Sequence, residues 1–289
     1  MCAPTREKCA SPMESGIVVI KIGGSVLTGL AAYHRAAAFL RRRSSESPGG
    51  RWIVVASAQH GHTDALLQLA GQAALSPDPA ALDLLWATGE LRSVGLLTLC
   101  LRAREVNAAG LNVHETGLTL SDGCSGPAGC TFTSRRLLEA LAGHSVVVVP
   151  GFLAVRPSGA MVSLGRGGSD LTAVLLAAHL GARRCELIKD VAGYFDRDPH
   201  RHADAAPIPA LSFERALEMA GAGCDLVQRE ALEAAAQYGL PLVVGSLDAC
   251  APRTRVGLGA EASSKLCTQE SQSIAAQPDS TSIQQETTP

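Results

Sequence analysis

A short segment in the middle of the chain combines three residue types that recognise small ligands. LGRGGSDLTAVLLAAHLGARR, residues 164–184, places glycines, Arg166 and Asp170 directly ahead of an alanine- and leucine-rich run. Glycine lets backbone N–H groups approach a ligand closely, and a guanidinium can bind a carboxylate through two parallel hydrogen bonds. The glycines of the segment are Gly165, Gly167 and Gly168. The segment therefore predicts a ligand-binding turn at the start of a helix.

Two residues of this segment carry further expectations. Ser169 is expected to cap the helix that follows, because a serine oxygen accepts hydrogen bonds from the first free N–H groups of a helix. Asp170 has two interpretations. It is either an acid that complements the helix dipole in the first turn, or a buried acid that orients cationic side chains around a transferring phosphoryl group.

A second glycine turn lies near the start of the chain, in KIGGSVL, residues 21–27. Gly23 and Gly24 follow a predicted strand, so their N–H groups lie at its carboxyl end, where open α/β sheets bind ligands. Lys21 would add an ammonium group there. The spacing matches neither the P-loop nor the dinucleotide fingerprint, and a tight turn with a surface lysine is the alternative. If both glycine turns belong to one site, Lys21 and Asp170 must lie close together.

The elements that position these turns alternate along the chain. Continuous apolar runs predict buried strands, and longer periodic segments predict helices. The predicted strands are residues 17–21, 52–57, 144–150, 185–190 and 240–245; the predicted helices are 31–43, 63–74, 80–104, 134–142, 169–181, 212–221 and 225–238. Strands separated by helices imply right-handed crossovers and a mainly parallel sheet covered on both faces.

Composition favours a protein that acts on small molecules. The 289 residues are 46% hydrophobic and carry a formal net charge of -2 with interspersed signs, which gives no basic face for nucleic acid. We expect no membrane partner, since no uninterrupted apolar run reaches the length of a bilayer span. Nine cysteines without a CxxC pair indicate reduced thiols and a cytoplasmic location. We expect a flexible N-terminus over 1–15, one domain over 16–247, and a disordered tail over 248–289 that is rich in Ser, Gln and Thr.

With these motifs in view, the chain resembles the amino-acid kinase family, and within it the catalytic domain of aspartokinases. Besides KIGGS and LGRGGSDLTA, the resemblance rests on segments that occur in the family's order. They are VVASAQHGHTDALLQLA (54–70), LDLLWATGE (82–90), VPGF (149–152) and KDVAGYFDRDP (189–199). The likeness covers roughly residues 16–246.

The resemblance implies a three-layer αβα fold with a mainly parallel central sheet. It also implies transfer of the γ-phosphoryl group of ATP, with Mg²⁺, to the carboxylate of a small amino acid. In aspartokinases this acceptor is L-aspartate and the product is 4-phospho-L-aspartate. Such chemistry depends on positioning and charge neutralisation, and a carboxylate nucleophile is already ionised at neutral pH. Members of the family often form homodimers, so a homodimer is implied as well.

The resemblance also implies roles for individual residues. Lys21 and Asp170 would be catalytic, with Lys21 neutralising charge on the phosphoryl group and Asp170 organising the lysines. Glu90 would bind the substrate's ammonium and Arg166 its carboxylate, although by itself Glu90 is equally an ordinary solvated acid. The nucleotide-binding residues would be Lys21, Gly23, Gly24, Ser25, Lys189, Asp190, Phe195 and Asp198. The substrate-binding residues would be Ser57, Thr63, Glu90, Arg166, Gly167, Gly168 and Ser169. No metal-ligating side chains are implied, because the nucleotide's own oxygens would hold Mg²⁺.

The sequence departs from the aspartokinase pattern at a second lysine. Where the family has Gly-Ala-Lys-Val-Leu-His-Pro, this chain places Asp225 at the lysine and Gln228 at the histidine. Loss of one charge-stabilising group costs on the order of 3 kcal/mol. We therefore hypothesise that Lys189, which stands where aspartokinases usually have threonine, replaces it as a third catalytic residue, with Asp225 turned elsewhere or paired with it.

Two alternatives stay open at this stage. KIGG, without an aromatic residue before the glycines, is closer to acetylglutamate kinases, so glutamate or an N-acyl amino acid is an alternative acceptor. Asp225 favours a catalytically weak regulatory subunit that binds nucleotide or amino acid. Residues 248–289 are fewer than one ACT domain needs, so we expect feedback control, if any, to come from another chain.

Overall fold

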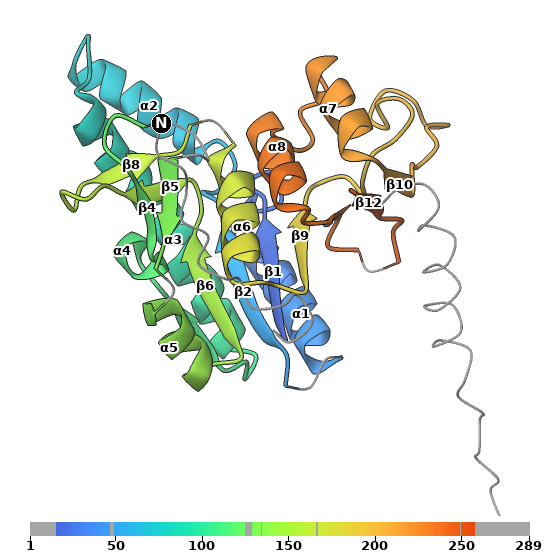
Figure 1. Ribbon diagram of the computed structural model, residues 1–289, viewed down its shortest axis with the longest axis horizontal. Coiled ribbons are helices and arrows are strands. Elements are labelled where there is room, and N and C mark those ends of the chain that lie inside the picture. The colour runs from blue at the N-terminus through green and yellow to red at the C-terminus, as the bar shows by residue number, and fades with distance from the viewer. Residues whose placement is uncertain are drawn as a thin grey trace, which may run out of the picture.

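An eight-stranded sheet forms the centre of the protein in the computed structural model, which describes residues 16–46, 49–124, 129–133, 135–165, 167–248 and 250–257 (Figure 1). Neighbouring strands are parallel except β11 and β12. In order across the sheet the strands are β10 (Ala210–Leu211), β12 (Thr254–Val256), β11 (Leu242–Gly245), β9 (Arg184–Ile188), β1 (Ile17–Ile22), β2 (Arg51–Ala56), β6 (Val146–Pro150) and β3 (Ala108–Gly110).

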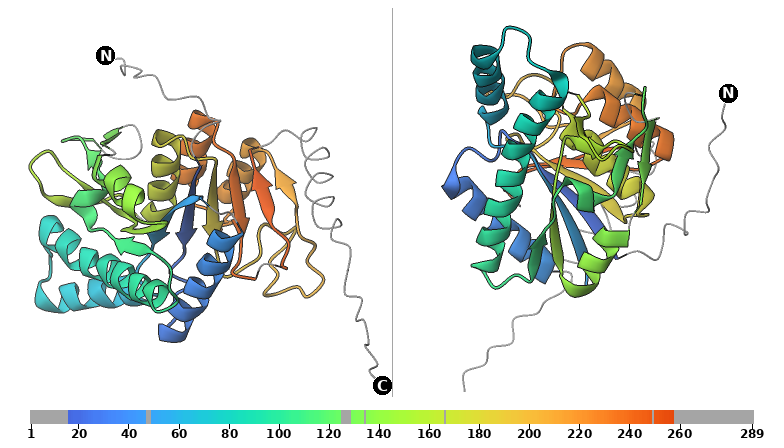
Figure 2. Two further views of the ribbon diagram at one scale, coloured as in Figure 1. Left: turned by 90° about the horizontal axis from the view of Figure 1, so that it is seen from below. Right: turned by 90° about the vertical axis from the view of Figure 1, so that its left-hand side faces the viewer.

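Helices cover both faces of this sheet. On one face α1 (Leu30–Ser45) and α3 (Pro79–Arg102) bury residues such as Phe39 and Leu97 against Ile20 and Val54. On the other face α5 (Arg135–Gly143), α6 (Gly168–His179) and α8 (Arg229–Tyr238) share a hydrophobic cluster with the strands. Figure 2 shows α1 and α3, in blue to teal, and α6 and α8, in olive to orange, on opposite sides of the strands. The predicted three-layer αβα fold with a mainly parallel sheet is confirmed.

The five predicted strands correspond to β1, β2, β6, β9 and β11, whose burial explains the continuous apolar runs. Every residue of β1 and β6 is buried, because a strand between two helical layers has no solvent-facing side. The predicted helices correspond to α1, α2 (His62–Ala73), α3, α5, α6, α7 (Phe213–Gly221) and α8. The periodicity of the sequence thus located the main elements.

A second, four-stranded sheet and a short helix were not predicted. The sheet has the order β5 (Cys130–Phe132), β4 (Leu118–Leu120), β7 (Leu153–Val155) and β8 (Met161–Ser163), and the helix is α4 (Val113–Thr116). Each strand has only three residues, too few for a recognisable apolar run. This sheet packs on α3 through β8 and on α6 through β7.

The predicted start of the tail at residue 248 is wrong. Residues 254–256 form β12, which pairs with β11 and β10 inside the central sheet, and Thr254 and Val256 are buried. The sequence of this segment, TRV, is too short and too polar to predict a strand. Its place in the sheet depends on pairing with β11 and β10, which local composition does not reveal. The predicted flexible N-terminus, 1–15, and residues 258–289 lie outside the described residues.

Helix α3 is long and apolar enough to span a bilayer by length and composition. In this fold it packs against α1, α2, β3 and β8. Its buried residues include Val94, Leu97 and Leu101, whereas Leu84 and Leu99 are exposed, so the core covers part of the apolar surface of α3.

Candidate active site

Asp170 binds two lysines at the carboxyl edge of the central sheet. Lys21 lies at the end of β1, Lys189 follows β9 directly, and Asp170 lies in the first turn of α6. Lys21 Nζ is 2.8 Å from Asp170 Oδ1 and Lys189 Nζ is 2.7 Å from Oδ2. All three side chains are largely buried. The two glycine turns therefore converge, as the sequence predicted.

The charges of this cluster determine the protonation of Asp170. Burial by itself raises the pKa of the Asp170 carboxyl, but the positive charges of Lys189 and Lys21 outweigh burial and hold that pKa well below its ordinary value. Burial lowers the pKa of Lys189 to about 8, although the carboxylate of Asp170 opposes this shift. Asp170 is thus an anion at neutral pH, and the cluster carries net positive charge.

The two lysines of the cluster are half of the lysines in the chain. The sequence contains only Lys8, Lys21, Lys189 and Lys265, and the first and last of these lie outside the described residues. Every lysine that the structure places is therefore bound to Asp170. The location of both at one carboxylate indicates a site that requires ammonium groups, which are compact point charges on flexible stems.

A pocket of about 450 Å³ opens at the same edge. It is formed by the ends of β1 and β2, the start of α2, the middle of α3 and the turn before α6. Of the predicted substrate residues, Ser57, Thr63, Glu90, Gly167 and Ser169 line it, together with Gly24 and Ser25 from the first glycine turn. The structure thus brings most of the predicted substrate residues to one cavity.

Glu90 is a buried carboxyl in this pocket rather than a solvated acid. Burial raises the pKa of Glu90 to about 8, while hydrogen bonds from the backbone of Ala58 and Gly151 and the charge of Lys21 lower it in part. Its Oε2 atom has no hydrogen-bond partner among the described residues. A ligand that brings a positive charge would satisfy this oxygen and stabilise the carboxylate form.

The turn before α6 depends on glycine. Gly167 has φ 73°, and a Cβ atom there would overlap the side chain of Gln228. Gly168 begins α6, where an added Cβ atom would lie 3.0 Å from Leu164 and 3.3 Å from Phe152, but it does not line the cavity. Arg166, the predicted partner of a substrate carboxylate, lies outside the described residues.

The predicted capping role of Ser169 is wrong. The N-cap of α6 is Gly167, which makes no side-chain hydrogen bond, and Ser169 lies inside the first turn. Ser169 is buried against Gly151, whose missing side chain leaves room for it. Because Gly167 in the left-handed conformation already turns the chain into the helix, the serine is left to face the pocket.

The first glycine turn differs from the prediction in one hydrogen bond. The N–H of Gly23 donates to the carbonyl of Ile188, 3.0 Å away, so it is not available to a phosphate. The N–H of Gly24 has no partner in the described part of the chain. A Cβ on Gly24 would lie 2.7 Å from the carbonyl oxygen of Ala58, which explains the need for glycine. Of the two glycine N–H groups predicted to face a ligand, only that of Gly24 is therefore free among the described residues.

The predicted nucleotide-binding loop after β9 meets the first turn at one point. Ser25 Oγ donates to Asp190 Oδ1 at 3.0 Å. Phe195 instead pairs with Pro207 through a backbone bridge. Asp198 accepts from the N–H of His200 and forms an ion pair with Arg201 in its own turn. Asp190 thus links this loop to the first glycine turn, whereas Phe195 and Asp198 make contacts within the loop farther along.

The segment that departs from the family pattern lies beside Asp170. The backbone N–H of Gln228, the N-cap of α8, is 3.4 Å from Asp170 Oδ2. Asp225 is exposed, and the ion-pair partner of Lys189 is Asp170. Of the two placements hypothesised for Asp225, the structure shows the one turned elsewhere.

Two aromatic residues of the pocket were not predicted. Trp86 and Phe152 line it and pack edge to face, with ring centroids 5.6 Å apart. Phe152 has φ 67°, a left-handed conformation that is rare for a bulky residue and typical of binding sites. Phe152 could have been identified as a pocket residue from its position directly after Gly151 in the VPGF motif.

A lysine–aspartate–lysine cluster beside a concave pocket at the carboxyl edge of a parallel sheet defines a class of α/β proteins that bind small anionic ligands. A model of the amino acid kinase family matches residues 16–246. The chain belongs to this family.

Similar proteins include aspartokinases. The aspartokinase of Thermus thermophilus is 38% identical over 241 residues, covering 83% of this chain and 59% of the relative. That of Geobacillus stearothermophilus is 34% identical, covering 80% of this chain and 56% of the relative. This chain therefore spans a little over half the length of these relatives.

Solved structures agree with this assignment. Aspartate kinase from Synechocystis has a TM-score of 0.73 at 32% identity, covering 83% of this chain and 39% of that one. E. coli aspartokinase III in complex with lysine and aspartate has a TM-score of 0.72 at 28% identity, covering 85% of this chain and 66% of that one.

Proposed function

We propose that this protein transfers the γ-phosphoryl group of ATP to the β-carboxylate of L-aspartate, forming 4-phospho-L-aspartate. The observation that carries the proposal is the placement of Lys21 and Lys189 on the buried Asp170, at the edge of a pocket that contains the buried Glu90. Relatives described as aspartokinases support the choice of aspartate.

The chemistry of the pocket fits this reaction. The two ammonium groups neutralise charge that develops on a transferring phosphoryl group, and the buried Asp170 fixes their positions before reaction. The free N–H of Gly24 is a further donor for phosphate oxygens. The acceptor carboxylate attacks without a general base, because it is ionised at neutral pH.

Glu90 suits the ammonium group of the acceptor. Its Oε2 lacks a partner, and an ammonium there would favour ionisation of a carboxyl whose pKa is raised to about 8 by burial. Ser57 and Thr63 line the same pocket, and Arg166 is assigned to the acceptor's α-carboxylate from the family resemblance alone. The pocket would thus select a small acid that also carries a positive charge.

The proposed cofactor Mg²⁺ enters with the nucleotide. Asp170 is occupied by two lysines and Asp190 Oδ1 accepts from Ser25. The described residues contain no group of three or more side chains suited to a metal. Mg²⁺ would be held chiefly by the phosphate oxygens of ATP, and Asp190 is the residue of the turn whose carboxylate would add a ligand.

We further propose that Lys189 replaces the lysine that the family carries at the position of Asp225. Lys189 directly follows β9, the strand next to β1, and binds the same carboxylate as Lys21. Both ammonium groups therefore lie beside the first glycine turn. The exposed Asp225 does not disturb this arrangement.

Hydroxylamine trapping tests the proposed function directly, since it detects an acyl phosphate. The full chain would be incubated with ATP, Mg²⁺ and L-aspartate, and in parallel with L-glutamate and N-acetyl-L-glutamate. We expect hydroxamate with aspartate above the other acceptors. Product with another acceptor alone would reassign the substrate, and tight ATP binding without product on any acceptor would favour the regulatory subunit instead.

Two further expectations accompany this function. We propose a homodimer, which light scattering on the purified chain would measure. We also propose a cytoplasmic location, supported by the absence of a disulfide among the cysteines in the described ranges.

A further inference from the structure

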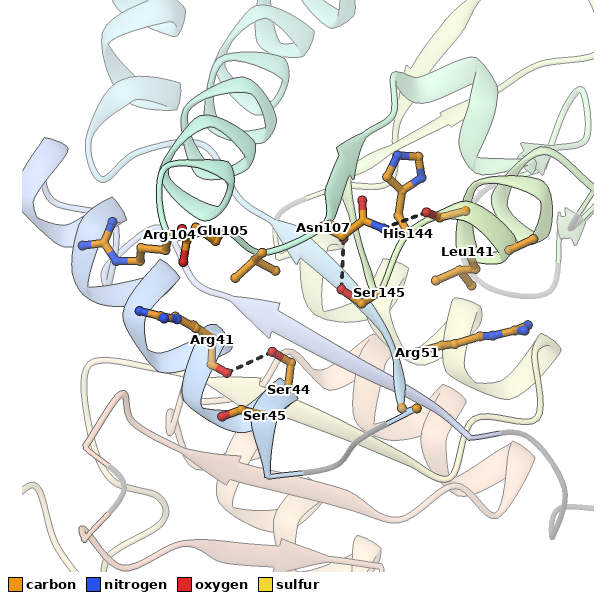
Figure 3. A pocket seen from close by; sticks show the side chains of 15 residues that line it. Arg41, Ser44, Ser45, Arg51, Arg104, Glu105, Asn107, Leu141, His144 and Ser145 are labelled. Atoms are coloured by element: carbon orange, nitrogen blue, oxygen red, sulfur yellow. Dashed lines mark hydrogen bonds between the residues drawn. The ribbon is translucent and has the colours of Figure 1, made fainter.

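A second cavity lies at the opposite edge of the sheet, where the strands begin (Figure 3). Its volume is about 610 Å³, and it is formed by the C-terminal ends of α1, α3 and α5 together with the starts of β2 and β6. We call it the amino-edge pocket and define it by Arg41, Ser44, Arg51, Arg104, His144 and Ser145. Strand β2 begins in this pocket and ends directly before Ser57 of the candidate active site.

Three arginines of the amino-edge pocket form no ion pair with any residue in the described ranges, although the acid Glu105 lines the same pocket. Arg104 Nη1 lies 3.0 Å from His34 Nδ1 and 3.2 Å from the carbonyl oxygen of Cys100, and it forms no ion pair with a residue that the structure describes. Arg41 and Arg51 form no ion pair with any residue that the structure describes. Most other arginines do have acidic partners, for example Arg43, Arg156, Arg215 and Arg229. Three guanidinium groups and one carboxylate, that of Glu105, line this cavity, and this excess of positive charge favours negatively charged ligands.

Helix dipoles explain only part of this concentration. Cationic side chains near the C-terminal end of a helix are stabilised by the dipole, which accounts for Arg41 in α1 and Arg104 after α3. Arg51 is the first residue of a strand, so the dipole does not account for it. The wall also contains Glu105 at φ 62°, a left-handed conformation uncommon for a residue with a side chain.

The uncharged donors of the pocket are already in use. Ser44 Oγ donates to the carbonyl of Arg41 and Ser145 Oγ donates to that of Asn107, at 2.9 and 3.0 Å. Asn107 Nδ2 donates to the carbonyl of Gly143. Each hydroxyl has a single proton, and His144 Nδ1 already lies 3.0 Å from the carbonyl oxygen of Ala140, so the guanidinium groups are the main side-chain donors left for a ligand. A ligand of this pocket must therefore be rich in acceptors and negatively charged.

The arrangement of the arginines sets the kind of anion. Figure 3 shows Arg41 and Arg104 on one side of the pocket and Arg51 on the other, with Ser44 and Ser145 between them. Arg41 and Arg51 are exposed, and their long stems allow the guanidinium groups to close over a ligand. We propose that the amino-edge pocket binds a small polyanion, a molecule with phosphate or carboxylate groups at both ends, separately from the candidate active site.

Isothermal titration calorimetry of the full chain with pyrophosphate and, separately, with citrate tests this proposal and distinguishes a phosphate ligand from a polycarboxylate. Wild type is expected to bind at least one of these probes. The double variant Arg51→Gln/Arg104→Gln removes guanidinium donors from both sides of the pocket. Each charge-assisted hydrogen bond lost is worth roughly a tenfold change in affinity or more, so we expect one binding equivalent to weaken at least about tenfold.

Two further proteins complete the comparison. The control Arg35→Gln/Arg229→Gln removes the same charge from exposed positions outside the pocket and should bind like wild type. The single variant Arg41→Gln, on an exposed face of α1, gives an independent weakening if the double variant unfolds. Pyrophosphate bound at Lys21 and Lys189 is common to all the proteins and cancels. Absence of binding by wild type, or equal binding by wild type and the pocket variants, would overturn the proposal.

Discussion

Lys21 and Lys189 lie on the two oxygens of one carboxylate, with Nζ atoms 2.8 and 2.7 Å from Asp170 Oδ1 and Oδ2. The two lysines come from adjacent parallel strands, and β1 and β9 pair directly. A single buried acid therefore fixes two cations that repel each other. This arrangement holds two ammonium groups beside the pocket, where the proposed function needs them for a phosphate group.

Removal of the Lys189 charge should reduce catalysis. Lys189→Met keeps the length of the side chain but removes one of two cations, and we expect the ATP-dependent rate of hydroxamate formation to fall about a hundredfold or more. Arg229→Met, which removes an exposed cation from the start of α8, should leave the rate unchanged. An unchanged rate in Lys189→Met would show that Lys189 does not take over the role of the family's second lysine, whose position Asp225 occupies.

Glu90 should make stability depend on pH in the ligand-free protein. Its folded pKa of about 8 lies above the ordinary value, so the folded state holds a proton that the unfolded state releases between about pH 4.5 and 8. Stability from this group is full below pH 4.5 and is lost as pH rises through 8. We therefore expect the free energy of unfolding of Glu90→Gln, relative to wild type, to rise by several kcal/mol across this window, at about 1.4 kcal/mol per pKa unit.

Urea unfolding of both proteins at a series of pH values measures this difference. The two proteins share every other titrating group, so the comparison isolates residue 90. A difference that does not change between pH 4.5 and 8 would mean that Glu90 is ionised in the folded protein, against its burial.

The buried Glu186 should hold helix α1 against the centre of the sheet. This residue of β9 is 1% exposed and pairs with Arg43 at 2.7 Å and Arg184 at 2.5 Å. Glu186→Gln leaves these arginines without a counter-charge, and we expect a loss of about 3 kcal/mol or more in the free energy of unfolding. The matched control is Glu233→Gln, whose partner Arg229 is exposed, and it should cost about 0.5 kcal/mol or less. Equal losses in the two variants would contradict the distinction between buried and exposed pairs.

The sequence was sufficient for the main layers because each buried strand carries a strong local signal. The runs IVVIK and HSVVVVP are apolar on both faces since helices cover both sides of β1 and β6. The second sheet and β12 gave no such signal. Their three-residue strands are specified by pairing with distant segments, as Thr119 with Val155, and not by local composition.

Site residues that lie in recognisable motifs could be predicted from the sequence, whereas features that depend on tertiary contacts could not. Lys21, Asp170 and Glu90 were found through glycine turns and family motifs. The use of the Gly23 N–H was not, because its acceptor Ile188 belongs to another strand. Trp86 has the sequence appearance of an ordinary apolar residue in a helix, and only the packing of α3 beside Phe152 brings it to the pocket.

Gly24 should tolerate no side chain, because it is the point where the first glycine turn passes the strand next to it. A Cβ atom there would lie 2.7 Å from the carbonyl oxygen of Ala58, a backbone atom that cannot move without displacing the end of β2. Ser57 directly follows that end, so Gly24→Ala should shift the pocket and the first glycine turn together. Since a displacement of about 1 Å can cost a hundredfold in rate, we expect hydroxamate formation to fall by at least about tenfold.

Gly95→Ala is the matched control, because Gly95 lies in α3 with nothing within 4 Å of the added atom. It should keep full activity and gain up to about 1 kcal/mol in the free energy of unfolding, since alanine favours a helix over glycine. Full activity in Gly24→Ala would mean that the turn has room to move, and that the proposed contact between its N–H and a phosphate does not require the observed geometry.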